Sequence, residues 1–376
     1  MADRYLGVPD ARAALLAGLA WASLLTGCGQ AGVGETPNSR GDANAAAATT
    51  TNAANALAEA PPLEAEPLRI EPALADGKER KNLSGAACHG SGLCLLIGDE
   101  KRYARYFRLA PGVLAPTESL LHLLPPELPD ESDAEGIAFA GGHFYIVGSH
   151  SRTKQGAEQA SRHFVYRVAA DAETGLPTGL GTDQAPSPAV ERATLDPIIA
   201  AHPLLSRHLT EPPGDNVARS GPSHGVNIEG IAVAGDTMFI GFRGPVDRDG
   251  AVILRTRASA VFGSGPASVD TARVRLGVGQ GIRDLAAVDG GLLILSGPER
   301  RLQVEARPEL FFWTWEREPV FLGRLQGRPL PEGEDSYDNP EAIAVLQETA
   351  DAYRLLVLWD GQSGGVPEIV RVPKRR

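Results

Sequence analysis

The sequence is poor in cysteine, in aromatic residues and in charge. Of its 376 residues, 3 are cysteines, 6% are aromatic and 22% are charged. Glycine and proline are frequent instead, with 43 and 29 copies. They interrupt every stretch in which a heptad could be sustained, which excludes a long coiled coil. Glycine does not recur at every third position, which excludes a collagen-like chain.

Long basic runs are also absent, and the formal net charge is -11 at pH 7. Proteins that bind nucleic acid present a basic face, so we expect no nucleic acid among the partners. A glycine-rich segment at 277–281 precedes an expected strand rather than a helix, which disfavours a dinucleotide-binding site. The nucleophile elbow of serine hydrolases does not occur in a fitting context.

The first 28 residues have the form of a lipoprotein signal. An apolar run over 13–25 is shorter than the roughly 20 residues that a membrane-spanning helix needs, and it has the length of a signal-peptide core. It ends in LTGC at 25–28, which resembles the bacterial lipoprotein box, in which the cysteine receives a diacylglyceryl group. We expect a signal peptide over 1–27 and lipidation, with palmitate, at Cys28.

The residues after Cys28 predict a membrane anchor and a tether. By resemblance to enterobacterial sorting rules, Gly29 in place of aspartate favours the outer membrane, and we expect the protein to face the periplasm. Several acyl chains give stable anchoring, so the membrane is one expected partner. Residues 28–66 contain too few large apolar side chains to fold, which predicts a disordered tether. The folded domain is then expected over 67–376.

The two remaining cysteines are expected to form a disulfide. Cys88 and Cys94 flank a glycine-rich turn between two short apolar runs, which reads as a strand, a turn and a strand. Cysteines that face each other across such a hairpin satisfy disulfide geometry, and an exported compartment permits the bond. The alternative is a metal site that combines His89 with both thiols, although zinc sites usually have tighter cysteine spacing.

A six-residue motif recurs five times along the body of the chain. The copies begin at residues 82, 133, 227, 281 and 339, and they read NLSGAA, DAEGIA, NIEGIA, GIRDLA and NPEAIA. Each is followed by a turn, an apolar run and, in most copies, a third expected strand. Antiparallel strands in repeats of about 50 residues are typical of β-propeller blades.

We therefore predict an all-β fold, a β-propeller of five blades with four antiparallel strands each. The long interval between the second and third motifs suggests a helical insertion near 187–210, interrupted at Asp196-Pro197, and a sixth blade in this interval is the alternative. The segment 68–70 is expected to supply the outer strand of the last blade and close the ring, which would protect sheet edges.

The repeats, together with three motifs that follow them, resemble an uncharacterised bacterial family. These motifs are GSHSR at 148–152, FRGP at 242–245 and SGPE at 296–299. The family is described only as a domain of unknown function with a predicted β-propeller, and the resemblance covers roughly 70–374. It is distantly similar to phytase-like and esterase-like propellers, which share the Glu-Gly-Ile element, but their catalytic metal clusters do not map onto this sequence. The resemblance thus implies the fold and no activity.

Polar residues of the motifs are expected to meet at one mouth of the central channel, because the first strand of a blade lines the channel and the second returns to the same end. The candidate ligand-binding residues are Glu135, His150, Arg152, Glu229, Arg243, Arg283, Asp284 and Glu341. Three glutamates, Glu135, Glu229 and Glu341, could bind calcium through their oxygens. His150 is the one candidate acid or base.

Two functions remain open from the sequence. The first is a membrane-anchored periplasmic binding or scaffold lipoprotein, whose propeller mouth holds a small molecule or a protein. The alternative is a calcium-dependent hydrolase of phosphate or other anionic esters. A third reading of the same residues is purely structural, with each glutamate paired to an arginine or to backbone N–H groups of the next blade. No complete catalytic set is visible, and a fold does not determine a function, so the sequence favours binding and leaves enzymatic activity undecided.

Overall fold

The computed structural model describes residues 62–128, 130–214, 225–263, 268–299, 308–315, 317–326, 339–360 and 367–375. The predicted signal peptide, Cys28 and nearly all of the predicted tether lie outside these ranges. Within them the chain forms five antiparallel sheets, each of which begins with one copy of the six-residue motif.

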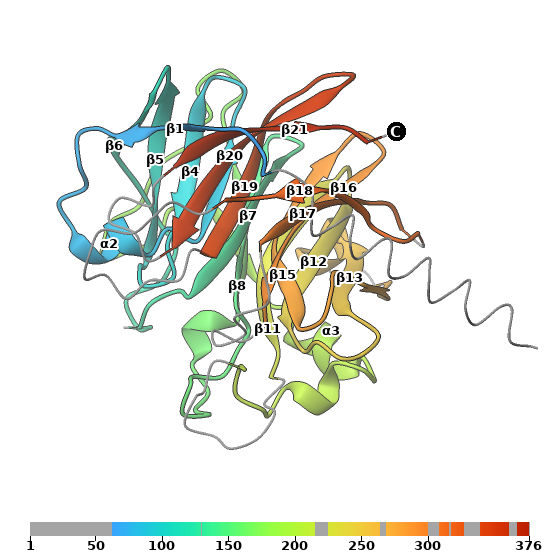
Figure 1. Cartoon of the computed structure of the whole chain (residues 1–376). Coiled ribbons are helices and arrows are strands. Elements are labelled where there is room, and N and C mark those ends of the chain that lie inside the picture. Colours follow the sequence, from blue (N-terminus) through green and yellow to red (C-terminus); the bar gives the residue numbers. More distant parts are fainter. Residues whose placement is uncertain are drawn as a thin grey trace, which may run out of the picture. The chain divides into compact units, whose positions relative to one another are not determined.

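The five sheets are the blades of a propeller (Figure 1). Blade 1 consists of β3 (Gly85–Cys88), β4 (Leu93–Ile97), β5 (Tyr103–Ala110) and β6 (Val113–His122). Blade 2 consists of β7 (Ala134–Ala140), β8 (His143–Gly148), β9 (Val165–Ala169) and β10 (Val190–Ala193). Blade 3 consists of β11 (Asn227–Ala234), β12 (Thr237–Gly244), β13 (Ala251–Arg257) and β14 (Asp270–Val274).

Blade 4 consists of β15 (Gln280–Val288), β16 (Gly291–Pro298), β17 (Glu309–Trp313) and β18 (Val320–Arg324). Blade 5 consists of β19 (Asn339–Glu348), β20 (Ala352–Asp360), β21 (Glu368–Pro373) and β1 (Ala65–Pro67). The inner strands β3, β7, β11, β15 and β19 surround the central channel, and each contacts the next around the ring. The prediction of five four-stranded blades is confirmed, and the alternative of six is excluded.

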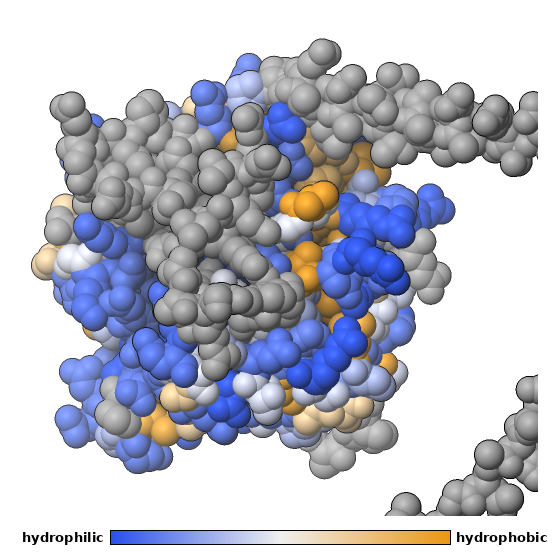
Figure 2. Space-filling view, turned by 60° about the horizontal axis from the view of Figure 1, so that its bottom comes forward, coloured by the Kyte–Doolittle hydropathy of each residue, from blue (hydrophilic) through white to orange (hydrophobic). Residues whose placement is uncertain are grey.

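Apolar side chains fill the spaces between blades. The described residues contain five clusters of buried apolar side chains, one for each pair of neighbouring blades. A blade has two apolar faces, and each is buried only when the next blade packs on it, so the ring is stable as a closed unit. Hydrophilic residues predominate on the face shown in Figure 2, where hydrophobic residues form a narrow strip.

The ring is closed by a short N-terminal segment that crosses three blades. Residue 62 forms a parallel bridge with Arg324 of β18, β1 pairs with β21, and β2 (Arg69–Ile70) pairs in parallel with β6. Figure 1 shows blue β1 running along red β21. The sequence assigned closure to 68–70, which was wrong by a few residues. Pro67 ends the pairing with β21, and the next residues turn away to blade 1.

The interval between the second and third motifs is only partly helical. Residues 190–193 form β10 instead, because they pair with β9 and complete blade 2. Helix α3 (Asp196–Ala201) and the short 3-10 helix η2 (Ser206–His208) follow. Pro197 does not interrupt a helix. It occupies the first turn of α3, where a missing N–H costs nothing, so it marks the start of the helix.

The remaining helical segments are short: α2 (Gly77–Lys81), the 3-10 helix η1 (Ala160–Arg162) and α4 (Ala258–Val261). In the described parts of the chain, no helix is long and apolar enough to cross a membrane. Cys88 and Cys94 pair directly across β3 and β4 and form the expected disulfide.

Candidate functional site

A β-bulge recurs at the same position in four of the five inner strands. The pairing of each inner strand with the second strand of its blade skips the third residue of the motif in β7, β11, β15 and β19. The skipped residues are Glu135, Glu229, Arg283 and Glu341. A bulged residue leaves the regular alternation of the strand, so its side chain can be redirected. All four of these side chains line one cavity at the mouth of the channel.

The bulge also explains the glycine in the Glu-Gly-Ile element. A Cβ atom on Gly136 would lie 2.9 Å from the backbone oxygen of Glu229, on the next inner strand. Real Cβ atoms do not approach a backbone oxygen this closely, so a larger residue would push the two strands apart. The glycine allows neighbouring bulges to sit side by side around the mouth.

Arg283 connects three blades on one side of the cavity. Its guanidinium group forms an ion pair with Glu229 of blade 3, with an Nη1–Oε2 distance of 2.8 Å, and a second ion pair with Glu341 of blade 5. Arg243 pairs with Glu229 at 2.9 Å, and the Asn227 amide donates to the same carboxylate at 2.9 Å. Both carboxylates on this wall are therefore matched by cationic or amide donors.

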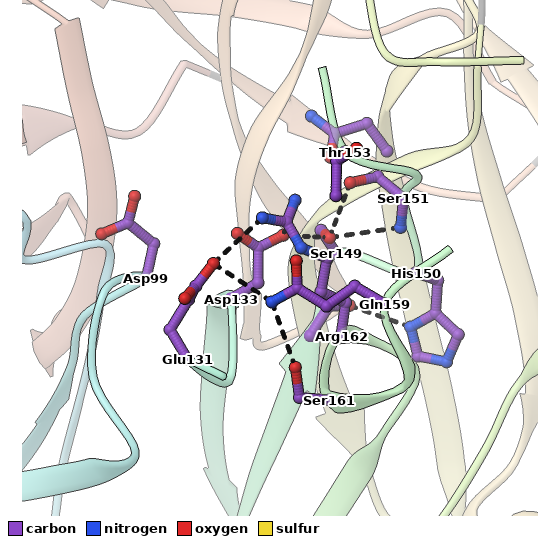
Figure 3. A network of polar contacts seen from close by, with 12 residues as sticks. Asp99, Glu131, Asp133, Ser149, His150, Ser151, Thr153, Gln159, Ser161 and Arg162 are labelled. Atoms are coloured by element: carbon purple, nitrogen blue, oxygen red, sulfur yellow. Dashed lines mark hydrogen bonds and ion pairs between the residues drawn. The ribbon is translucent and has the colours of Figure 1, made fainter. Parts of the chain in front are cut away.

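A second polar network forms the wall between blades 1 and 2 (Figure 3). Arg162 pairs with Glu131 at 3.2 Å and with Asp133 at 3.1 Å, and Gln159 donates to Glu131 at 3.2 Å. Asp133 also accepts a hydrogen bond from the Ser149 hydroxyl. One arginine thus serves two carboxylates on this wall.

The cavity between these walls has a volume of about 430 Å³. It is strongly polar, and acidic groups outnumber basic ones. The acidic lining residues are Asp99, Glu100, Glu131, Asp133, Glu135, Glu229 and Glu341, and the basic ones are Lys154, Arg162, Arg243 and Arg283. The field in the cavity therefore favours positive charge.

Two carboxyl groups on the blade 2 side have pKa values above the ordinary range. Burial, followed by repulsion from Asp133, Glu229 and Asp99, raises the pKa of Glu135 well above its usual value. Burial also raises the pKa of Asp133, although Arg162 and the Ser149 hydroxyl act in the opposite direction. Strongly shifted carboxyl groups in a cleft are common at functional sites.

The structure brings together five of the eight candidate ligand-binding residues: Glu135, Glu229, Arg243, Arg283 and Glu341. The other three do not line the cavity. Arg152 donates to the backbone oxygens of Leu209 and Gly156, both at 3.1 Å, and so connects its loop to the insertion. Asp284 is 1% exposed, and its two oxygens accept the N–H groups of Leu285 and Ile343. Asp284 therefore joins blade 4 to blade 5, and burial raises its pKa well above the usual value.

His150, the one candidate acid or base, is 2% exposed and has both ring nitrogens occupied. Nδ1 donates to the carbonyl of Gly148 at 2.9 Å, and Nε2 accepts from the N–H of Leu195 at 3.2 Å. Burial lowers the pKa of His150 to about 4. Its backbone has a φ of 51°, which is unusual outside glycine and is held in place by these bonds. His150 therefore fixes the insertion to blade 2.

The three glutamates proposed for calcium do not form one ligand set. Calcium takes about 6–8 oxygen ligands, but the carboxylates of Glu229 and Glu341 are engaged by Arg283. Within the described ranges, no group of three or more acidic, histidine or cysteine side chains is arranged to hold a metal ion. The residues at the mouth therefore do not fit calcium.

Several cavity residues were not among the candidates from the sequence. Asp133 and Asn227 occupy the first position of the motif, two residues before a bulged glutamate, and strand alternation would have placed them on the same face. Glu131 and Gln159, which lie in loops, and Arg162, the last residue of η1, are all outside the repeat, so periodicity carried no signal for them.

These observations define the molecule as a five-bladed β-propeller with a polar cavity at one mouth. A model of a family described as a protein of unknown function (DUF3616) matches residues 111–173 and 191–365, and the chain belongs to this family. No curated protein sequence matches the chain.

The solved structures that match the chain do so at low sequence identity and low TM-score. Arabinanase Arb43A of Bacillus subtilis is 10% identical, with a TM-score of 0.38, over 78% of this chain and 94% of that one. Virginiamycin B lyase of Staphylococcus aureus is 10% identical, with a TM-score of 0.37, over 83% of this chain and 100% of that one. YCF48 bound to D1 peptide is 14% identical, with a TM-score of 0.32, over 81% and 68%. Likenesses of this size carry no argument about activity.

The Arg283→Met variant should lower the free energy of unfolding by about 3–5 kcal/mol, because it leaves the buried carboxylates of Glu229 and Glu341 without their shared partner. Urea unfolding followed by tryptophan fluorescence measures the loss. In a Glu229→Gln, Glu341→Gln background the same substitution should cost much less. Equal losses in both backgrounds would show that the two ion pairs do not stabilise the ring.

His150 should make the protein less stable in acid. Its folded pKa of about 4 lies below the unfolded value of 6.5, so the stability that the neutral ring contributes is full above pH 6.5 and is lost as the pH falls towards 4. The difference corresponds to about 3 kcal/mol. Urea unfolding between pH 7 and 4 should show a shallower decline for His150→Gln than for the wild type. His143→Gln is the matched control, because Nδ1 of His143 also bonds a backbone carbonyl two residues earlier. Parallel declines for all three proteins would contradict the assignment.

Proposed function

We propose that this protein is a lipid-anchored periplasmic binding protein that takes a small polar ligand into the mouth cavity of its propeller. The observation that carries the proposal is the shared bulge, through which four blades direct a charged side chain into one cavity of about 430 Å³. Small-molecule sites are concave and have a few polar groups fixed by a rigid scaffold. The cavity is concave, and its four bulged side chains are fixed on inner strands of the ring.

Two further features support the placement in the periplasm. LTGC at 25–28 has the form of a lipidation signal, and the disulfide between Cys88 and Cys94 suits an oxidising compartment. A hydrolase of anionic esters has no comparable support. The arginines that could hold an anion are already paired with carboxylates, and His150 is closed off from the cavity.

The anchor depends on Cys28. In bacterial cells fed radioactive palmitate, the wild-type chain should be labelled and recovered with the outer membrane, whereas Cys28→Ala should be unlabelled and leave the membrane fraction. Gly29→Asp should keep the label and move to the inner membrane in a host with enterobacterial sorting, and Gly29→Ala should behave as the wild type. A labelled, membrane-bound Cys28→Ala protein would refute the anchor.

The cavity can be closed at its rim without touching its polar networks. Gln155 is exposed on a loop that lines the cavity, so Gln155→Trp should block the mouth and leave the fold stable. After incubation with periplasmic small molecules, native mass spectrometry should detect a retained ligand on the wild type and on Gln184→Trp, a matched change at an exposed loop position outside the cavity lining. Gln155→Trp should retain none. Equal retention by all three proteins would show that the ligand binds elsewhere, and no retention by the wild type would contradict a binding function.

A further inference from the structure

Glu135 is the exception among the four bulged residues. The bulged residue of blade 4, Arg283, forms ion pairs with the bulged glutamates of the two neighbouring blades, Glu229 and Glu341. Glu135 projects from blade 2 and has no such neighbour. The corresponding residue of blade 3 is another glutamate, Glu229, and that of blade 1 is Ser84, which has a short uncharged side chain. Among the described residues, Glu135 has no hydrogen bond and no ion pair. When Glu135 is ionised, its charge is therefore not balanced by a paired arginine, unlike the charges of Glu229 and Glu341.

The groups around Glu135 increase this imbalance. Asp99 follows β4, Asp133 precedes β7, and both raise its pKa by repulsion, as does Glu229 from β11. Arg283 from β15 acts in the opposite direction, but its guanidinium group is shared by two other carboxylates. Arg162 is likewise shared, between Glu131 and Asp133. Lys154, on the loop after β8, also lines the cavity, but neither it nor any other described residue forms an ion pair with Glu135.

We propose that the ligand of the mouth cavity is an organic cation, whose ammonium or guanidinium group binds Glu135 and fills this place in the ring. The inference rests on the proposed binding function and names its ligand class. An ammonium group donates three hydrogen bonds and accepts none, which matches a wall of carboxylate oxygens. An anion would meet the acidic excess of the cavity, and a metal ion would need more unengaged oxygens than the bulged glutamates provide.

Binding of a cation should therefore change the protonation state of Glu135. A cation close to the carboxylate favours the ionised form, so binding near neutral pH should release a proton, and affinity should rise with pH. Other charged groups face the same space and set the background for this effect. They are Asp99, Glu100, Glu131, Asp133, Lys154, Arg162, Glu229, Arg243, Arg283 and Glu341.

Three probes of equal chain length separate the ligand classes: cadaverine, pentanediol and glutarate. Isothermal titration calorimetry on the purified full-length protein should show binding of cadaverine alone, with proton release visible as a dependence of the heat on the buffer. Glu135→Gln should weaken cadaverine at least about tenfold and abolish the proton release. Glu118→Gln, a matched change at an exposed position of β6, should bind as the wild type does.

Thermal unfolding without ligand distinguishes a binding role from a structural one. Glutamine replaces a carboxyl group that is buried and is repelled when it ionises, so the stability of Glu135→Gln should equal or exceed that of the wild type. A structural Glu135 would give a less stable variant. A less stable Glu135→Gln, or cadaverine binding that this variant leaves unchanged, would overturn the assignment to Glu135.

Calcium chloride serves as a fourth probe, for a metal ion. Binding of glutarate, pentanediol or calcium in place of cadaverine would overturn the organic-cation class and leave the binding function standing. No binding of any probe would also overturn the cation class. The proposed function is then decided separately by whether the cavity retains a periplasmic molecule.

Discussion

The cavity mouth depends on one guanidinium group. Arg283 occupies the bulge of blade 4 and pairs with the bulged glutamates of both neighbouring blades, although it is only 3% exposed. A buried charge is costly unless it is paired, and here one cation satisfies two anions that would otherwise repel each other. The same contacts hold three inner strands in register at the channel. Replacement of this arginine by a neutral residue would change both the packing of the ring and the charge of the cavity.

Much of the fold could be predicted from sequence because the repeat is local. Each motif combines strand residues with a turn, and five copies determine five blades. Segments whose structure is set by distant partners could not be assigned in this way. Val190–Ala193 is a strand only because β9 offers an open edge, and Ala65–Pro67 closes blade 5 only because β21 does.

The site residues that belong to the six-residue motif could be predicted from the sequence. The motif placed Glu135, Glu229, Arg283 and Glu341 at one end of the channel, and the structure adds that a bulge directs them into a common space. Asp284 follows a bulged residue but faces the next blade, and His150 lies beside the cavity wall with its ring turned to the insertion. The sequence shows which residues end a strand. The direction of each side chain depends on the bulge and on tertiary hydrogen bonds.

The two ends of the central channel differ in chemistry. The mouth is lined by carboxylates and guanidinium groups, whereas the inner strands line a separate cavity of about 250 Å³ with alanine, valine, leucine, isoleucine and phenylalanine side chains and Cys88. A charged ligand would lose its hydration in the apolar part without gaining hydrogen bonds there. Passage through the ring would therefore be unfavourable for such a ligand, which would have to enter and leave by the polar mouth.

The N-terminal segment that closes the ring has a mechanical consequence. It contacts β18 of blade 4, β21 of blade 5 and β6 of blade 1 within nine residues, 62–70. A chain held to a membrane through Cys28 would be pulled at this segment, and its pairings with all three blades would resist the pull. The segment on which such a load would act is thus also the seam of the propeller, where blades 4, 5 and 1 are joined.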